Sequence, residues 1–328
     1  MKKRKDGRYQ KAITINGKKT FFYGKTVAEV NKKILKYQEK EEQGRLFKQV
    51  AEEWYDKIVN EISPNTTVGY LSAKNDAINI FGDRPIKEID AIDINNYLIS
   101  LKQKGFAYKT VITKLQIVRQ ILDYAMLKGE IQINPANIVK VPKSLPRETR
   151  EPATQQDIEK IKASNNLLAL TALYTGCRKG ELLALHINDF DFINNTITIN
   201  KSVYHDGKYP YLKEPKTKAG IRTIPLLEPL KREIEPLKIK GYLFNCNGEL
   251  LTKWQARDLW NKFCKEYQVN CTLHQLRHAY ATRLYELNID IKSAQELLGH
   301  ADTKTTSDIY THLTEMKRKL TADKLSDF

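Results

Sequence analysis

The chain of 328 residues is longer than one typical domain, and its 41% of hydrophobic residues suffices for two or three packed cores. No run of about 18 apolar residues occurs, so no membrane span is expected, and the basic start lacks the apolar stretch of a secretory signal. The four cysteines form no CxxC pair, which favours reduced thiols in a cytoplasmic protein over zinc or disulfides; they are Cys177, Cys246, Cys264 and Cys271.

Positive charge is concentrated at the start of the chain. The formal net charge is +16, and residues 1–25 hold nine Lys or Arg against the single Asp6, a balance of +8. Charge this concentrated indicates an anionic polymer as partner. Nucleic acid is favoured over a membrane surface because no amphipathic basic helix lies in this segment. The alternative is that these charges serve only to keep the protein soluble.

Residues 1–45 are predicted to form a three-stranded sheet covered by one helix. Asp-Gly at 6–7 and Asn-Gly at 16–17 favour tight hairpin turns and separate the strand-like stretches RYQKAITI and KKTFFYGK. The capping pattern from Thr26 to Glu29 begins the helix, whose apolar face is expected to hold Val27, Val30, Ile34 and Tyr37. The other face of the sheet carries Lys, Arg and aromatic residues. It is either a solvated face or a surface that lies in a DNA groove.

Residues 46–139 read as a small helical bundle with short turns. The first helix is marked by Phe47, Val50, Trp54 and Ile58. Ser63 and Pro64 suit the cap and first position of the second helix. A short helix is expected over residues 93–101, and a longer one is lined by Leu115, Val118, Leu122 and Ala125.

Residues 140–153 are predicted to be a semi-rigid linker, because three prolines favour extended backbone there. Residues 154–328 form the largest predicted domain, mainly α with one small antiparallel sheet from NTITIN, KSVYH and GIRTIPL. The predicted fold class is therefore multidomain α+β, with a small sheet-and-helix domain, a helical bundle and this larger domain.

Arg178 stands at a predicted helix start in TGCRKGELLAL. A helix N-terminus favours anions, and an arginine there can bind two phosphate oxygens at once. Glu181 lies one turn later on the same face and is suited to orient an active-site Arg or His. An ordinary surface Arg–Glu pair is the alternative for these two residues taken alone.

A second group of candidate residues follows in HQLRH, on a helix whose core face carries Leu273, Leu276, Tyr280, Leu284 and Leu287. His274 and Arg277 project about 60° apart from the edge of that face and can converge on one anion. A zinc site of the HExxH type is disfavoured, because Gln275 replaces the glutamate base and no third ligand is evident. His300 and Tyr310 lie downstream.

Together these stretches resemble the tyrosine recombinases, specifically the integrases of phages and conjugative transposons. TGCRKGELLAL, PKTKAGIRTIPL, HQLRH, LGH and TTSDIYTH occur in the family's order, and the bundle ends in NPA. The resemblance implies that Arg178 and Arg277 clamp the scissile phosphate, and that Tyr310 is the nucleophile. It also implies proton transfer by His274, a hydrogen bond from His300, a general acid at Lys216 on a β-hairpin, and support from Glu181. Lys218 remains the alternative to Lys216.

The same resemblance implies how the domains and partners are used. Residues 1–45 would bind arm-type DNA sites, while 46–139 and 154–328 would clamp core-type sites on double-stranded DNA. A homotetramer would recombine two duplexes through a Holliday junction, without metal or ATP, in the bacterial cytoplasm at the nucleoid. An excisionase and a host DNA-bending protein are the implied helpers. The basic residues expected to contact DNA are Lys2, Lys3, Arg4, Lys5, Arg8, Lys11, Lys18 and Lys19.

Three other functions remain open at this point: a resolvase or invertase of the same family, a non-catalytic DNA-binding regulator, and a metal-dependent hydrolase that uses His274 and His278. The basic N-terminal sheet favours integration. The C-terminal helix, with Leu313, Met316 and Leu320 on one stripe, either closes its own domain or docks on a neighbouring subunit.

Overall fold

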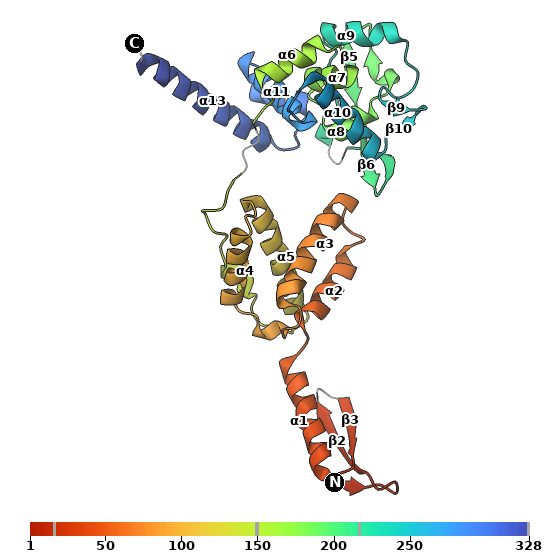
Figure 1. The fold of residues 1–328 in the computed structure, drawn as a ribbon, viewed down its shortest axis with the longest axis vertical. Coiled ribbons are helices and arrows are strands. Elements are labelled where there is room, and N and C mark those ends of the chain that lie inside the picture. Colours follow the sequence, from red (N-terminus) through yellow and green to blue (C-terminus); the bar gives the residue numbers. More distant parts are fainter. Residues whose placement is uncertain (16–17, 148–150, 216–217, 327–328) are drawn as a thin grey trace. The chain divides into compact units, whose positions relative to one another are not determined.

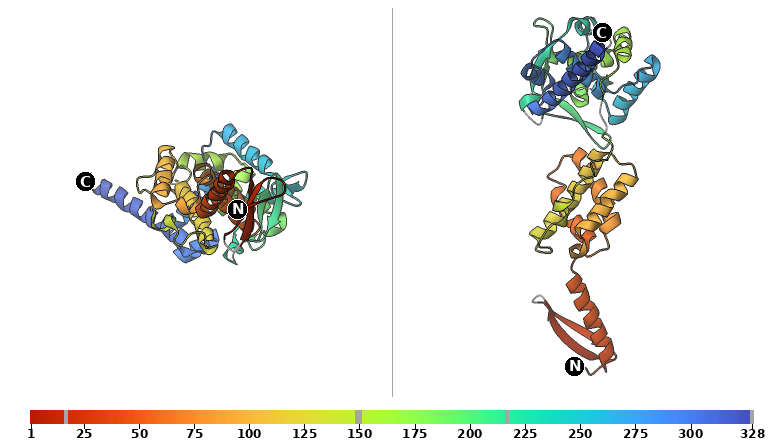
Figure 2. Two further views of the ribbon diagram at one scale, coloured as in Figure 1. Left: turned by 90° about the horizontal axis from the view of Figure 1, so that it is seen from below. Right: turned by 90° about the vertical axis from the view of Figure 1, so that its left-hand side faces the viewer.

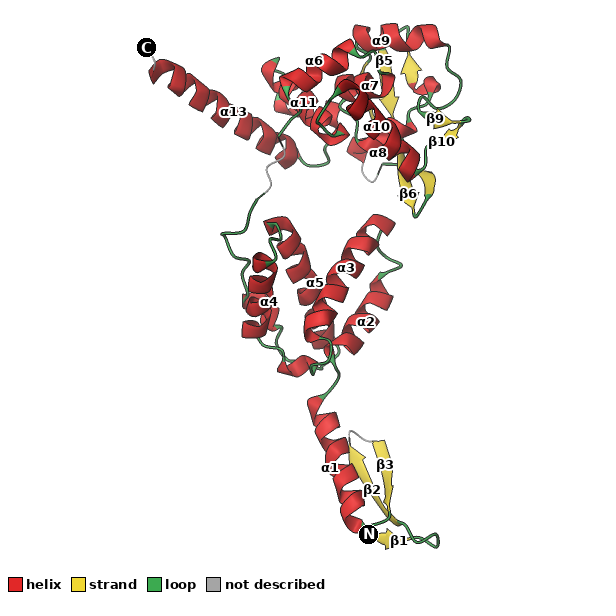
Figure 3. Ribbon diagram, viewed as in Figure 1, coloured by secondary structure: helices red, strands yellow, loops and turns green. Residues whose placement is uncertain are grey.

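The computed structural model describes residues 1–15, 18–147, 151–215 and 218–326. It comprises two compact units, Met1–Glu148 and Thr149–Phe328 (Figures 1 and 2). Helices and small antiparallel sheets occur together (Figure 3), which confirms the predicted α+β class. No helix in the described ranges is long and apolar enough to cross a membrane.

The chain begins with the predicted three-stranded antiparallel sheet, formed by β1 (Lys2–Lys3), β2 (Tyr9–Ile15) and β3 (Lys18–Gly24). Helix α1 (Val27–Gln43) packs on it, and the Thr26 hydroxyl accepts a hydrogen bond from the Glu29 amide at 3.1 Å. Val30 and Ile34 are buried as expected. Val27 is 43% exposed, so its place on the buried face was wrongly predicted. The Asn16-Gly17 turn lies outside the described residues.

The bundle comprises α2 (Phe47–Ile58), α3 (Pro64–Phe81), α4 (Ala91–Gln103) and α5 (Tyr108–Leu127), with 3-10 turns at Ile86–Glu88 and Pro135–Ile138. The α4 helix begins two residues earlier than expected, because the Asp90 carboxylate accepts from the Asp93 amide at 2.8 Å and caps it. The core includes Phe47, Trp54 and Leu122. It also includes Leu145, so the predicted linker is packed against the bundle for part of its length.

The second unit carries eight helices in its described part, and their bounds are α6 (Gln155–Ala163), α7 (Leu167–Thr175), α8 (Lys179–Ala184), α9 (Glu228–Ile234), α10 (Lys253–Tyr267), α11 (Leu273–Glu286), α12 (Ile291–Leu298) and α13 (Thr303–Ser326). Helix α7 is buried along most of its length. It lies against α11 and α9 at the centre of the main core.

The described strands of this unit form three small sheets where one was predicted. The first contains β4 (Phe190–Asp191), β5 (Thr196–Ile199) and β8 (Arg222–Pro225); the others are the pairs β6 (Ser202–Asp206) with β7 (Tyr209–Lys213) and β9 (Asn245–Cys246) with β10 (Glu249–Leu250). The prediction missed YPYLK as the partner of β6. A tight turn with Gly207 at φ +57° folds these strands onto each other instead of onto β5.

A smaller apolar cluster lies apart from the main core. It joins the end of α11 to α12 and the start of α13 through Ala281, Leu284, Ala294, Leu298 and Tyr310. This cluster fixes the turn that carries Gly299 and His300. In the predicted C-terminal stripe, only the side chain of Leu313 is among those the structure describes; Met316 and Leu320 are not.

Candidate active site

Arg178 and Glu181 lie at the start of α8, as predicted. Gly176 ends α7 with φ +59°, where a Cβ atom would lie 2.4 Å from the Tyr280 ring, so only glycine fits the sharp turn into α8. Arg178 is the N-cap residue, and its amide and guanidinium both donate to the Glu181 carboxylate, at 2.9 and 2.8 Å. The Arg178 side chain remains 43% exposed, which leaves its guanidinium accessible to a ligand.

Glu181 is buried and contacts three arginines. Its Oε1 accepts from Arg178, and its Oε2 accepts from Arg222 Nη2 at 2.9 Å and lies 3.9 Å from Arg277 Nη1. Burial alone would raise the pKa of this carboxyl, but the hydrogen bonds and charges of the arginines outweigh it, so the pKa is lowered. Glu181 is therefore an anion at neutral pH, placed behind the three arginines.

The same three arginines also bind the end of α12. The last carbonyls of a helix lack partners within it and lie at the negative end of its dipole. Here each is taken by a different guanidinium: Leu297 O by Arg222 Nε at 2.8 Å, Leu298 O by Arg277 Nη2 at 2.6 Å, and Gly299 O by Arg178 Nη2 at 2.8 Å. The arginines are thus fixed between one carboxylate and one helix end, which holds three like charges side by side.

Arg277 is the most buried of the predicted clamp residues, with 5% of its surface exposed. Its Nη1 donates to Gly176 O at 2.8 Å, directly before α8. Burial, followed by the neighbouring charge of Arg178, lowers the pKa of Arg277 to about 9. The guanidinium remains protonated at neutral pH. It supplies a desolvated positive charge, the kind that stabilises an anion most strongly.

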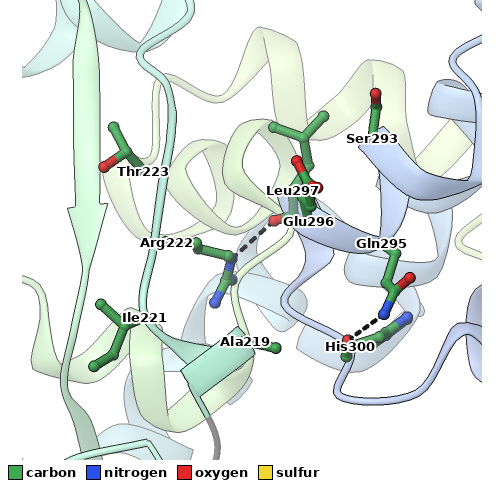
Figure 4. A pocket seen from close by; sticks show the side chains of 9 residues that line it. All are labelled: Ala219, Ile221, Arg222, Thr223, Ser293, Gln295, Glu296, Leu297 and His300. Atoms are coloured by element: carbon green, nitrogen blue, oxygen red, sulfur yellow. Dashed lines mark hydrogen bonds between the residues drawn. The ribbon is translucent and has the colours of Figure 1, made fainter.

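His300 follows α12, half-buried in a pocket of about 460 Å³ between that helix and β8 (Figure 4). Its Nδ1 lies 2.8 Å from Thr306 Oγ1, and its carbonyl accepts from Gln295 Nε2 at 3.0 Å, so the ring is held in place. Burial, then the charges of Arg277 and Arg178, lowers the pKa of His300 to about 4. At neutral pH the imidazole is uncharged and can serve as a hydrogen-bond donor or acceptor.

His274 and Arg277 lie on the same turn of α11 but differ in exposure. Arg277 is buried, whereas His274, just after the Thr272 cap, is exposed, with its ring 4.8 Å from that of His278. His274 therefore lies on the solvent-facing side of α11, on the same turn as Arg277. The arrangement is compatible with a proton-handling role for His274 at the edge of the site.

Tyr310 lies on α13 and is 93% buried, with only 7% of its surface exposed. Its hydroxyl donates to Ile289 O at 3.1 Å, and the Tyr285 ring packs edge-on at 5.2 Å. Burial, then the negative charge of Asp290, raises the pKa of Tyr310. The arginine hydrogen bonds described above all go to other groups, so this structure brings Arg178, Glu181, Arg277 and His300 together but holds the Tyr310 hydroxyl at Ile289.

The predicted general acid, Lys216, lies outside the described residues. Lys218 begins the 3-10 turn Lys218–Gly220, and the position of its side chain is not described. Arg222, four residues further on, was missed as a candidate. The sequence did carry a signal: along β8 the residues alternate buried and exposed, and Arg222 occupies an inward position that an apolar residue normally fills.

The eight basic N-terminal candidates lie at different places on and beside the first sheet. Phe22 contacts Tyr37 of α1, so the helix covers the Phe22 face, and Lys11, paired with Phe22, belongs to that side. Lys19 lies on the open face, 5.7 Å from the ring of Phe21. The others are placed as follows: Lys2 and Lys3 on β1, Arg4, Lys5 and Arg8 in the exposed loop after it, and Lys18 at the start of β3.

A second basic group occurs beside the clamp. Lys179 follows Arg178, and burial together with the charges of Lys253 and Arg257 lowers its pKa. Arg257 in turn lies over the half-exposed ring of Trp254, 4.4 Å from its centroid. Sequence reasoning did not single out these residues, because the helix starts that carry them are more than 70 residues apart in the chain.

Comparison with known proteins agrees with this architecture. Residues 148–317 match the phage integrase family, and residues 47–141 match the phage integrase central domain. Tyrosine recombinase XerA of Pyrococcus furiosus is 32% identical over 68% of this chain and 77% of its own length. A XerC-like tyrosine recombinase of Caldanaerobacter subterraneus is 28% identical over 97% of this chain and 96% of its own length.

Two solved structures share the fold. The Tn1549 transposon integrase in complex with transposon right end DNA has a TM-score of 0.70 at 23% identity, covering 83% of this chain and 99% of that one. A lambda integrase tetramer bound to a Holliday junction has a TM-score of 0.64 at 19% identity, covering 93% of each chain. With the family matched over more than half of its length, and with Arg178, Glu181, Arg277 and His300 gathered in one place, this chain belongs to the phage integrase family and is a tyrosine site-specific recombinase.

Proposed function

We propose that this recombinase is the integrase of a mobile element and that it cuts and rejoins double-stranded DNA through a 3′-phosphotyrosine bond at Tyr310. The observation that carries the proposal is the group of three arginines fixed between Glu181 and the end of α12. Three positive charges against one negative charge leave a net charge of +2 beside the exposed Arg178. That charge suits a phosphodiester whose negative charge increases during transfer.

The proposed reaction exchanges one phosphoester for another. The Tyr310 oxygen attacks phosphorus, the bond to the 5′ oxygen breaks, and the leaving oxygen takes a proton from Lys216. The tyrosyl proton passes to His274. Arg178 and Arg277 hold the nonbridging oxygens, and uncharged His300 hydrogen-bonds to one of them. Because the phosphoester energy is conserved, rejoining needs no ATP.

Before that step, Tyr310 has to leave Ile289. The hydroxyl gives up one hydrogen bond, a net cost of about 0.5–1.5 kcal/mol, and the ring leaves its contact with Tyr285. Binding of DNA and of neighbouring subunits is the proposed source of that free energy. A homotetramer on two duplexes, recombining through a Holliday junction, is supported by the fold it shares with the lambda integrase tetramer.

The nucleophile is tested with a core-site duplex that carries a nick near the cleavage position, so that the cut end diffuses away. The wild type is expected to form a covalent protein–DNA adduct on denaturing gels, and Tyr310→Phe is expected to form none. Tyr285→Phe is the matched control, because it removes a hydroxyl from the adjoining ring and should leave adduct formation intact. An adduct with Tyr310→Phe would refute the assignment.

The proposed use of the domains is that residues 1–45 bind arm-type sites, while residues 46–139 and 154–328, joined by 140–153, clamp core-type sites. The basic group formed by Lys179, Lys253 and Arg257 would bind phosphates next to the scissile one. Deleting residues 1–45 should abolish arm-site binding and preserve adduct formation on an isolated core site. Loss of both activities would contradict this division. An excisionase and a host DNA-bending protein are proposed helpers at the nucleoid.

Resolution of dimers is the second candidate function. The observation that favours it is that the relative matching this chain over 97% of its length is named a XerC-like tyrosine recombinase and not an integrase. The two functions differ in the DNA they require. A resolvase should recombine two short core sites by itself, whereas an integrase should need arm-type sites or helper proteins, and a plasmid recombination assay with and without those sites distinguishes them.

A further inference from the structure

Arg222 is a buried charge that contacts no reacting atom in the proposed reaction. Its side chain is 5% exposed, and all three guanidinium nitrogens have acceptors. Nε donates to Leu297 O at 2.8 Å, Nη1 to Gly220 O at 3.3 Å, and Nη2 to Glu181 Oε2 at 2.9 Å. Figure 4 shows the side chain extending from β8 toward α12, with the bond to Leu297 drawn. A group so enclosed cannot reach a DNA phosphate.

The three acceptors belong to three separate parts of the candidate site. Leu297 lies in the last turn of α12, which leads into Gly299 and His300, and Gly220 ends the 3-10 turn that begins at Lys218. Glu181 is the carboxylate that holds Arg178. The planar guanidinium of Arg222 therefore links the end of α12, the Lys218–Gly220 turn and Glu181.

Packing around this link leaves little room for adjustment. A Cβ atom on Gly299, where φ is +65°, would lie 2.7 Å from Arg222 Nη1 and 3.0 Å from Ala219 O. A Cβ atom on Gly220 would lie 2.3 Å from the Pro215 side chain. The backbone of both turns lies directly against its neighbours. A shift of the Arg222 guanidinium would therefore be transmitted to His300 and to the Lys218–Gly220 turn.

We propose that Arg222 is a positioning residue for strand transfer, which holds the His300 turn and the Lys218–Gly220 turn in register with Glu181 and Arg178. This inference rests on the proposed function of the site. Arg222 would affect the reaction only through His300, Glu181 and Arg178. Its removal should slow chemistry while leaving DNA affinity unchanged.

Electrostatics provides a readout that is independent of activity. The charged or titratable neighbours of His300 come from four elements: Arg277 and His278 from α11, Arg178 from the start of α8, Arg222 from β8, and Glu296 from α12, which lines the same pocket. Thr306 of α13 is its hydrogen-bond partner. Burial is the main cause of its lowered pKa, and the three arginine charges add to it. Removing the Arg222 charge should therefore raise the pKa of His300 toward its ordinary value. Replacing Arg222 with lysine keeps the charge and should leave that pKa close to the wild-type value.

The test compares Arg222→Gln, Arg222→Lys and the control Arg232→Gln, which removes an arginine from an exposed pair with Glu228. Three quantities are measured: the rate of adduct formation on the nicked core site, the Kd for that site, and the titration midpoint of His300 by NMR with labelled histidine. His300→Gln assigns the resonance.

Arg222→Gln and Arg222→Lys are expected to slow adduct formation by roughly 10- to 100-fold, by analogy with residues that orient metal-binding side chains through hydrogen bonds. Neither should change Kd, and only Arg222→Gln should raise the His300 midpoint. Arg232→Gln should match the wild type throughout. Wild-type rates in both Arg222 variants, or a loss of affinity that accounts for the lost rate, would overturn the proposal.

The two proposals fail in different ways. If the wild-type protein forms no adduct, strand transfer at Tyr310 is rejected, and the positioning role of Arg222 is rejected with it. A wild type that forms the adduct, together with an unchanged His300 midpoint and unchanged rate in Arg222→Gln, would reject only the role of Arg222. Circular dichroism checks folding, and if Arg222→Gln does not fold, the rate and Kd of Arg222→Lys decide the matter.

Discussion

Glu181→Gln is the substitution that most directly tests the arrangement of the arginines. The carboxylate is 95% buried and contacts Arg178, Arg222 and Arg277. Glutamine keeps the shape but removes the charge, and its amide nitrogen would face an arginine donor. Removing one partner from a buried ion pair costs about 3–5 kcal/mol, because the remaining charge is left uncompensated. For a unit of this size, that loss lowers Tm by roughly 6–20 °C.

The lowered pKa of Glu181 predicts how the stability difference between wild type and Glu181→Gln changes with pH. The pKa of Glu181 is lowered in the folded protein, so its contribution to stability is fully present above the pKa of the unfolded chain. That contribution disappears as pH falls through the folded pKa. The difference in free energy of unfolding between wild type and Glu181→Gln should therefore be large at pH 7 and shrink in acid.

Urea unfolding followed by tryptophan fluorescence measures this difference. Two of the three tryptophans, Trp254 and Trp260, lie in the second unit, so a Trp54→Phe background restricts the signal to it. Glu228→Gln, which breaks an exposed pair, is the control and should cost about 0–1 kcal/mol. A Glu181→Gln protein as stable as wild type at pH 7, or equally weakened at all pH values, would refute the reasoning.

Three further predictions concern DNA and protons. Lys253→Glu should weaken core-site binding and reduce its salt dependence by about one counterion, as measured by fluorescence anisotropy; Lys262→Glu, on the opposite side of α10, should not. Phe21→Ala should weaken arm-site binding in a gel-shift assay, whereas Lys11→Ala, on the helix-covered side of the sheet, should have little effect. The rate of adduct formation should fall as pH decreases toward about 4, where His300 becomes charged. His300→Gln should remove that decline. If this variant still loses rate in acid, the decline arises from a group other than His300.

Much of the site could be predicted because its signals are local. Arg178 and Glu181 are three residues apart on one helix start, and Arg277 lies in a short motif on a regular helix. Periodicity therefore placed them correctly relative to their own helices. The position of the Tyr310 hydroxyl could not be predicted in this way. It depends on the carbonyl of Ile289, 21 residues earlier, whose orientation is set by how α11, α12 and α13 pack.

Each missed feature has its own physical cause. Arg222 looked like one basic residue among many, because its three acceptors lie 2, 41 and 75 residues away. The β6–β7 pair was missed because YPYLK contains a proline, which argues against a central strand but is tolerated in a two-stranded hairpin. Val27 fits the helical period, but it is the first residue of α1 and is exposed.

The end of α12 has a consequence for when the phosphate site forms during folding. Its three carbonyls are taken by arginines 75, 21 and 121 residues away in the chain. Closing a loop of 121 residues instead of 21 costs roughly 1.5 kcal/mol more entropy, and the longest loop also brings in Glu181. The contact of Arg178 with Gly299 O can form only after residue 299 has been synthesised. Until then the chain holds the three arginines and Glu181 but lacks one acceptor of the clamp, together with His300 and Tyr310, so we expect it to be unable to cut DNA during its own synthesis.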